Sequence, residues 1–236
     1  MGRDSTVDYL AEGAYRLYCL SRIRVMVIDS LVLATGNRHK VEEIQSILND
    51  VGIPMLTLNE FPDFPAVEED GLTCQANAVK KAVATAKFTG HWALADDTGL
   101  EVDALQGRPG VYAARYAGEH ATYEDNCQKL LQELHGVPSD QRTARFITVV
   151  ALANPDGETE TVEGVLEGII TQEFHGTGGF GYDPVFYVPQ LGKTLAEMTF
   201  AEKNRISHRA QAVTNAKSLL TTHRHLAQES GRSAAR

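Results

Sequence analysis

Apolar residues in the first part of the chain alternate between strand-like runs and helical spacing. Residues 27–34 form a β-branched apolar run, which predicts a buried strand that ends at residues 35–37. Apolar residues then recur three and four positions apart, at Val41, Ile44, Ile47 and Leu48. This spacing places them on one face of a helix. A strand followed by a helix is therefore expected from residue 27 onward.

The alternation continues through the middle of the chain. Residues 73–88 carry apolar positions at helical spacing, and Gly90 is a typical stop after a helix. Residues 92–95 predict a short strand that ends at Asp96-Asp97-Thr98-Gly99, which is rich in turn-forming residues. A third helix is predicted from Thr122 to Gly136.

The last third predicts a hairpin and then a long helix. Residues 143–153 and 159–172 are β-rich, and Asn154-Pro155-Asp156-Gly157 between them is a strong hairpin signal. The last helix is predicted over residues 207–226. Early alternation with a late hairpin predicts an α/β fold with a mixed sheet. We expect residues 1–26 to be an extension outside the fold, 27–227 to form the domain, and 228–236 to be a frayed tail.

Charge and cysteine content narrow the classes of function. A net charge of −9 argues against nucleic acid as the main partner, because binding to phosphate backbones needs a basic face. No apolar run approaches the roughly 20 residues of a membrane span. Cys19, Cys74 and Cys127 form no closely spaced pair, so a reducing cytoplasm is expected rather than a disulfide framework. A small anionic substrate remains compatible with this balance.

The segment from His175 to Pro184 has the composition of a ligand-binding loop. Glycines here let the backbone approach a ligand, and Phe180, Gly181, Tyr182 and Asp183 add aromatic faces and a carboxylate. This predicts a pocket wall for a flat, polar, nucleotide-like ligand. Residues 176–181 match the dinucleotide fingerprint, but a β-rich stretch between two prolines follows where that motif requires a helix. The Rossmann interpretation is therefore rejected.

A strand-to-helix turn offers a candidate phosphate site. It contains Thr35, Gly36, Asn37, Arg38, His39 and Lys40. Amide groups at a helix start carry partial positive charge, and a lysine in the first turn opposes the helix dipole unless an anion lies nearby. The alternative is that Asn37 or Thr35 only caps the helix and Lys40 is solvated.

Acidic residues form two candidate clusters. Asp96 and Asp97 follow an apolar strand, and successive side chains on a strand point to opposite faces, so only one should face a given site. A carboxylate there is suited to binding Mg²⁺ or to accepting a proton from water. Glu68 and Glu69 precede a helix, where they either stabilise its N-terminus or add a metal ligand. Both interpretations of each cluster remain open.

Basic residues gather at the start of the last helix. His208 and Arg209 follow Ser207, and Lys203 lies just upstream. Cations are unfavourable in the first turn of a helix, which indicates an anionic or carbonyl-rich ligand. The alternative is a surface cluster of basic groups.

Five stretches in register resemble one known family, the inosine triphosphate pyrophosphatases, also called non-standard purine NTP pyrophosphatases. The matching segments are residues 33–37 with Lys40, 95–100, 109–116, 176–184, and 202–203 with 206–209. The resemblance covers about residues 27–227. The family has a serine where Thr98 stands, and a hydroxyl is retained there.

The resemblance implies a fold, a reaction and partners. It implies a long mixed sheet with helices on both sides, and two lobes around a central cleft. It also implies Mg²⁺-dependent cleavage of ITP, dITP or XTP between the α- and β-phosphates, by a homodimer. Related enzymes acting on modified pyrimidine nucleotides and a non-catalytic nucleotide sensor are the competing hypotheses.

The resemblance also implies residue roles. Thr35, Asn37, Lys40 and Lys203 would hold the triphosphate. Asp97, with Glu68 or Glu69, would bind Mg²⁺, and Glu68 is preferred. Asp97 is the expected general base, a task that Asp96 shares in one version. Phe180 would stack on the purine, Tyr182 would line the pocket, Asp183 would contact the base edge, and His208 and Arg209 would donate to the 6-oxo group.

Overall fold

The computed structural model describes residues 28–234, so the expected extension 1–26 lies outside the described residues. Residues Ile28–Leu220 form one compact unit that contains the whole sheet, and residues from Thr221 onward belong to a second unit. None of the helices in the described part of the chain is long and apolar enough to cross a bilayer.

The unit is built on one eight-stranded sheet with the order β2-β1-β3-β5-β6-β7-β8, and β4 pairs with β3. The strands are β1 (Leu31–Leu33), β2 (Met55–Thr57), β3 (Trp92–Val102), β4 (Pro109–Gly110), β5 (Thr143–Ala153), β6 (Thr159–Ile170), β7 (Phe186–Val188) and β8 (Lys193–Thr194). β1 runs parallel to β2 and β3, whereas the β3–β5 and β5–β6 pairs are antiparallel. The predicted mixed sheet and hairpin are confirmed.

The α-helices of the described residues are α2 (Arg38–Leu48), α3 (Cys74–Thr89), α4 (Tyr123–Glu133), α5 (Phe200–Ile206) and α6 (His208–Ala234). The first three lie close to the predicted helices, α6 extends beyond its predicted end, and α5 was not predicted. Short 3₁₀ helices cover Leu58–Glu60, Asp103–Leu105, Ala113–Arg115, Ser139–Gln141, Asp183–Val185 and Leu195–Glu197. Thr73 caps α3, which ends at Gly90 in the left-handed conformation. Thr122 and Asp125 form a capping box at the start of α4.

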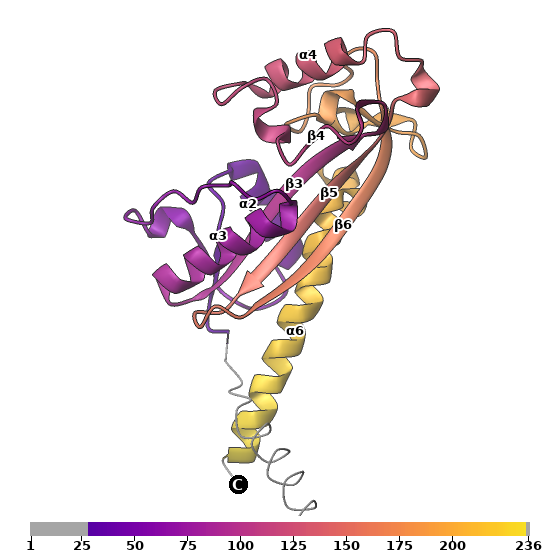
Figure 1. Cartoon of the computed structure of the whole chain (residues 1–236). Coiled ribbons are helices and arrows are strands. Elements are labelled where there is room, and N and C mark those ends of the chain that lie inside the picture. The colour runs from indigo at the N-terminus through magenta and orange to yellow at the C-terminus, as the bar shows by residue number, and fades with distance from the viewer. Residues whose placement is uncertain (1–27, 235–236) are drawn as a thin grey trace, which may run out of the picture. The chain divides into compact units, whose positions relative to one another are not determined.

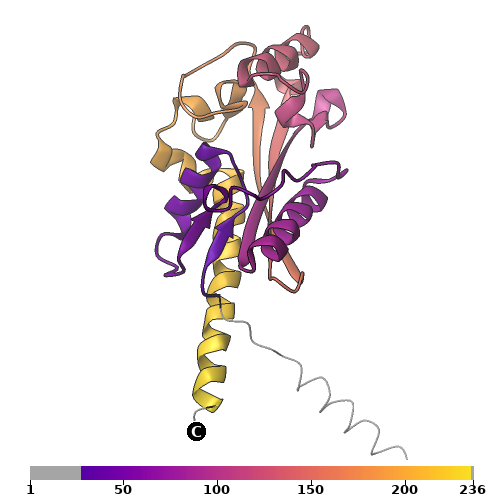
Figure 2. The same cartoon turned by 90° about the vertical axis from the view of Figure 1, so that its left-hand side faces the viewer.

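The helices cover both faces of the sheet. α3 packs along β3 and β5 on one face (Figure 1). α2 and the first turns of α6 lie beside each other, and Lys217 Nζ of α6 donates to the Ile47 carbonyl oxygen of α2 at 3.3 Å (Figure 2). α6 continues to Ala234, eight residues beyond the predicted end at residue 226.

Two hydrophobic clusters lie at different ends of the long strands. The α3 cluster includes Ala78, Ala82 and Ala151. The α4 cluster includes Leu130 and Phe186. The small alanine side chains let α3 approach the sheet closely, whereas large side chains fill the other cluster. These clusters are the cores of the two expected lobes on one continuous sheet.

Strand β3 is longer than predicted. The Asp96-Asp97-Thr98-Gly99 sequence lies within the strand, because β5 pairs with it residue by residue, from Ala93 opposite Ala153 to Val102 opposite Ala144. The prediction of a turn at these residues is wrong. Their local preference for turns is overridden by the antiparallel partner, as is common in sheets. Because both aspartates lie within the strand, their side chains point to opposite faces of the sheet.

Candidate active site

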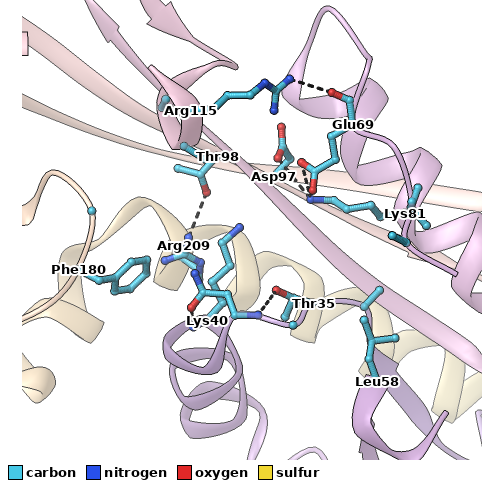
Figure 3. A pocket seen from close by; sticks show the side chains of 18 of the residues that line it. Thr35, Lys40, Leu58, Glu69, Lys81, Asp97, Thr98, Arg115, Phe180 and Arg209 are labelled. Carbon is cyan, nitrogen blue, oxygen red and sulfur yellow. Dashed lines mark hydrogen bonds and ion pairs between the residues drawn. The ribbon is translucent and has the colours of Figure 1, made fainter. Parts of the chain in front are cut away.

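A cavity of about 790 Å³ opens beside the middle of β3. Predicted site residues that line it are Thr35, Gly36, Asn37, Lys40, Glu69, Asp97, Thr98, Phe180, Gly181, Tyr182, Asp183, Lys203, His208 and Arg209. The predicted residues that do not line it are Arg38, His39, Glu68 and Asp96. Segments distant in sequence thus meet at one site, as Figure 3 shows for the residues that it labels.

The two adjacent aspartates face opposite sides of the sheet, as predicted. Asp96 contacts Lys40 from α2 and Arg209 from α6. Asp97 contacts Lys81 from α3 and lines the cavity. The alternation of side chains along β3 produces this division. Each carboxylate therefore has a different environment despite adjacent positions in sequence.

Asp96 is a buried member of a charge network. Its Oδ2 atom lies 2.9 Å from Lys40 Nζ and 3.0 Å from Arg209 Nε, and the residue is 1% exposed. Burial alone would raise the pKa of this carboxyl, but Lys40 and Arg209 outweigh it and hold the pKa well below its usual range. A carboxylate that holds its proton so weakly is a poor base. The structure therefore argues against Asp96 as a partner in general-base catalysis.

Asp97 has the properties expected of a base. Burial raises the pKa of its carboxyl, Glu69 raises it further, and Lys81 and Lys40 act in the opposite direction. Asn77 Nδ2 lies 3.4 Å from Asp97 Oδ2 and also contacts the carbonyl oxygen of Gly71. Asn77 thus fixes the carboxylate relative to the loop that precedes α3.

The structure distinguishes Glu68 from Glu69, a choice that the residues alone left open. Glu69 lines the cavity, and its Oε2 atom lies 3.2 Å from Lys81 Nζ. Arg115 Nη2 donates to the Glu69 carbonyl oxygen at 3.0 Å and holds the loop in place (Figure 3). Glu68, the preferred ligand in the sequence analysis, is exposed and outside the cavity lining. Glu69 is therefore the better candidate.

Lys81 occupies the point between the two candidate metal ligands. Its Nζ atom contacts Asp97 Oδ1 at 3.4 Å, Glu69 Oε2 at 3.2 Å and the Asp96 carbonyl oxygen at 2.8 Å. Burial alone would lower the pKa of this amine, but the neighbouring carboxylates outweigh it and raise the pKa. The carboxylates around this amine therefore favour a positive charge at this point.

The same donor set fits Mg²⁺. No group of three or more His, Cys, Asp or Glu side chains suited to hold an ion occurs among residues 28–234. Mg²⁺ does not require one, since it commonly binds one or two carboxylates and completes its shell with water and substrate phosphates. Asp97 and Glu69 are the oxygen donors available for this purpose.

The turn before α2 is arranged as a capped helix start. Asn37 Oδ1 accepts from the amides of His39 and Lys40 at 3.0 and 3.4 Å, so these donors already have a partner. Lys40 Nζ lies 2.9 Å from Asp96 Oδ2, and the residue lines the cavity. Arg38 pairs with Glu42 on the exposed face of the helix. Lys40 is therefore the residue of this turn best placed to meet an anion.

Phe180 lies among cations and rings at another part of the cavity. Lys203 Nζ and Arg209 Cζ lie 4.6 and 5.4 Å from its centroid, within cation–π range. His39 stacks on the ring at 5.1 Å with an interplanar angle of 12°. His39, although outside the cavity lining, thus contacts the side chain expected to stack on a purine.

The loop that carries Phe180 is held by buried polar contacts. Asp183 Oδ2 accepts from the Phe180 amide at 2.9 Å and from Lys203 Nζ at 2.5 Å. Tyr182 donates its hydroxyl proton to the Ala113 carbonyl oxygen at 2.8 Å. Lys203 also pairs with Glu43 at 3.0 Å. Lys203 therefore supports the loop and the aromatic ring, and the contact of Asp183 with a base edge stays a prediction.

The glycines of this loop serve the fold more than they serve ligand access. A Cβ at Gly179 would lie 2.0 Å from Asp183 Oδ2, and one at Gly176 would lie 2.6 Å from the Ala196 carbonyl carbon. Both residues also have positive φ angles. At these two positions the missing side chain allows close packing of the loop on its own chain, whereas Gly181 lines the cavity and a Cβ there would meet no atom within 4 Å.

Three residues that line the cavity or support its lining were not identified from the sequence. Lys81 lies on the buried face of α3, four residues from both Asn77 and Thr85, and this helical spacing is the signal that was available. Glu43 lies three residues after Lys40 on the apolar face of α2 and is buried. Arg115 carried no such signal, because its role depends on a loop 46 residues earlier.

A mixed α/β sheet, a cavity with paired carboxylates and lysines, and an aromatic ring flanked by donors together define an enzyme for an anionic ligand with a planar ring. The chain belongs to the Ham1 family, whose model matches residues 31–219.

Relatives and solved structures agree with this assignment. The chain is 54% identical over 190 residues to a dITP/XTP pyrophosphatase of Desulforamulus reducens, covering 80% of this chain and 94% of that protein. It is 52% identical over 183 residues to a dITP/XTP pyrophosphatase of Geobacter sulfurreducens, covering 78% and 92%. A solved HAM1 protein from Coxiella burnetii has a TM-score of 0.76 and 43% identity, covering 84% of this chain and all of that one. The predicted fold class and family are confirmed.

Proposed function

We propose that this protein hydrolyses the non-standard purine nucleoside triphosphates ITP, dITP and XTP to monophosphate and pyrophosphate, with Mg²⁺. The observation that carries the proposal is that one cavity contains groups suited to two parts of a nucleotide. Lys40, Lys81 and Asp97 suit a phosphate chain, and Phe180 with Arg209 suits a flat base. The names of the relatives support the same substrates, since both are dITP/XTP pyrophosphatases.

The phosphate end has the groups that hydrolysis requires. Lys40 and Lys81 offset the negative charge of the phosphates, and Asp97 accepts the proton of the attacking water. Its raised pKa keeps this carboxylate basic enough for that task. Asp97 and Glu69 would hold Mg²⁺, whose charge stabilises the departing pyrophosphate. Arg115 keeps Glu69 in position through its backbone.

The base end explains preference for a 6-oxo purine. His208 and Arg209 line the cavity next to Phe180 and offer N–H donors. Hypoxanthine and xanthine present a carbonyl oxygen at C6, whereas adenine presents an amino group. Donors that face the amino group lose their acceptor, at a cost of roughly 1–3 kcal/mol for each group left unpaired.

A substrate panel tests the proposal. We expect pyrophosphate from ITP, dITP and XTP in the presence of Mg²⁺, little turnover of ATP and GTP, and no turnover with EDTA. Pyrophosphate and orthophosphate are assayed separately with each nucleotide. Orthophosphate as the first product would show that cleavage occurs at the terminal phosphate instead. Equal rates with ATP would contradict the proposed preference for 6-oxo purines.

Replacing Lys81 by methionine tests the assignment of Asp97 as the base. Activity falls as the pH drops through the pKa of Asp97, because the protonated carboxyl cannot accept a proton. Lys81 lowers that pKa, so its removal is expected to shift the acid limb of the kcat/KM profile to higher pH. The profile is measured at fixed Mg²⁺.

Lys80→Met is the matched control for this shift. Lys80 is the adjacent residue and pairs at the surface with Asp70, 2.6 Å away, so its loss should leave the profile unchanged. If the acid limb of the kcat/KM profile does not move in Lys81→Met, that limb reports the titration of a group other than Asp97.

We also propose a homodimer, as the family resemblance implies, and a cytoplasmic location, as the cysteine content predicts. Cys74 and Cys127 are free thiols, which suits a reducing compartment. Light scattering on the purified protein tests the dimer, and cell fractionation tests the compartment.

A further inference from the structure

A row of hydrogen bonds connects Arg209 to His208 through two threonines. Arg209 Nη2 donates to Thr98 Oγ1 at 3.2 Å. Thr98 Oγ1 and Thr148 Oγ1 lie 2.7 Å apart, and Thr148 Oγ1 lies 2.6 Å from His208 Nδ1. Thr148 is fully buried and His208 is 4% exposed. Thr148 therefore lies beneath the base end of the cavity, and the other three residues of the row line it.

The sheet register creates this row. Thr98 on β3 is directly opposite Thr148 on β5, and Thr148 is directly opposite Gly164 on β6. Directly opposed side chains lie on the same face of a sheet and are close enough to bond. Gly164 completes the arrangement, since a Cβ there would lie 2.2 Å from the His208 carbonyl oxygen. Its missing side chain lets the first turn of α6 approach Thr148.

The direction of the protons along the row follows from its ends. A guanidinium group has only donors, so Thr98 Oγ1 must accept from Arg209. If Thr98 then donates to Thr148 and Thr148 donates to His208 Nδ1, every hydroxyl proton in the row has an acceptor. The opposite direction leaves the Thr98 hydroxyl proton without an acceptor among its contacts in the described residues.

His208 is also kept neutral. Burial lowers the pKa of its imidazole well below the usual value, and the nearby charges of Arg209 and Lys203 add to this effect. Its ring stacks on Phe146 at 4.5 Å, which fixes its plane. A neutral imidazole carries its proton on one nitrogen, and the hydrogen bond at the other nitrogen decides which one.

We propose that Thr148 is a positioning residue for base selection: through the row from Arg209 it makes His208 Nδ1 an acceptor and places the ring proton on Nε2, facing the ligand. The inference rests on the proposed function for the identity of that ligand. A fixed N–H donor matches a carbonyl oxygen at C6 of a purine and mismatches an amino group. The specificity then depends on a threonine that has no contact with the cavity.

The tautomer is tested first, in the protein without substrate. Histidine labelled with ¹⁵N is incorporated into the full chain, and the His208 ring is assigned by its proximity to the Phe146 ring. The expected spectrum has the proton on Nε2 and an unprotonated Nδ1 throughout neutral pH. A proton on Nδ1, or an imidazolium at neutral pH, would overturn the proposal whether or not the protein hydrolyses ITP.

Substitutions then test the link to selectivity. Thr148→Val keeps the shape of the side chain and removes the hydroxyl, so a mixture of the two tautomers is expected. The ratio of kcat/KM for ITP over ATP should fall about tenfold, the value of roughly one hydrogen bond, mainly through KM for ITP. Thr148→Ser should restore both the tautomer and the ratio.

Thr161→Val on β6 is the control, since it removes a strand hydroxyl outside the row. An unchanged ratio in Thr148→Val, or a serine variant no better than the valine variant, would contradict the proposal. Absence of ITP hydrolysis in the unmodified protein, with the Nε2 proton present, would instead reject the proposed function and leave the tautomer assignment standing.

Discussion

Replacing Asp97 by asparagine is expected to abolish measurable turnover while the protein remains folded. Loss of a general base typically reduces rates by roughly 10²–10⁴-fold, and the same change removes a candidate Mg²⁺ ligand. Asparagine has nearly the same shape and remains able to contact Asn77, so the packing of β3 against α3 is kept. The measurement is kcat for ITP at saturating Mg²⁺, together with a thermal melt.

The effect on stability has a defined sign. The folded-state pKa of Asp97 is raised, so folding disfavours its charged form, and this penalty is present when the pH lies above that pKa. A neutral asparagine removes the penalty. The melting temperature of Asp97→Asn at neutral pH should therefore equal or exceed that of the unmodified protein.

Asp70→Asn is the matched control for this prediction. Asp70 lies in the loop that precedes α3, is exposed, and pairs at the surface with Lys80. Its substitution should change neither kcat nor the melting temperature appreciably. Near-normal turnover in Asp97→Asn would remove this residue from the mechanism, and a large drop in melting temperature would reveal a structural role instead.

Local sequence signals predicted those parts of the fold that local interactions determine. Thr73, Gly90 and the Thr122–Asp125 pair marked helix ends correctly, because capping groups lie within a few residues of the groups they satisfy. The turn-rich sequence at residues 96–99 misled the prediction of β3, because β5 supplies the pairing from about fifty residues away. Non-local pairing is the physical reason for the error.

The same distinction applies to the candidate site. The family resemblance identified most of the residues that line the cavity, including Phe180 and Arg209. It gave no weight to Lys81, Glu43 or Thr148, whose roles depend on partners on other elements. The choice between Glu68 and Glu69 also needed the structure, since only the path of the loop decides which side chain enters the cavity.

A buried charge network connects the base end of the cavity to the core. It contains Lys40, Asp96, Arg209, Glu43, Lys203 and Asp183. Glu43 is its centre, with Oε1 3.0 Å from Lys203 Nζ and Oε2 2.6 Å from Arg209 Nη1. Buried ion pairs add little net stability when they are intact, but loss of one partner leaves an uncompensated charge in a medium of low dielectric constant.

Glu43→Gln is therefore expected to lower the free energy of unfolding by about 3–5 kcal/mol. For a domain of this size, that loss lowers the melting temperature by roughly 6–20 °C. The uncharged amide cannot offset Lys203 and Arg209, which support the Phe180 ring, so KM for ITP should rise as well. Thermal and urea melts at neutral pH measure the change in stability.

The neighbouring Glu42 makes the test specific. Glu42 pairs only at the helix surface with Arg38, at 2.8 Å and with both side chains well exposed. Surface pairs contribute about 0.2–1 kcal/mol, so Glu42→Gln should melt within a few degrees of the unmodified protein. The two substituted glutamates are adjacent in sequence but lie on different sides of α2. Equal melting temperatures would contradict the network, because burial and pairing are the physical differences between the two glutamates.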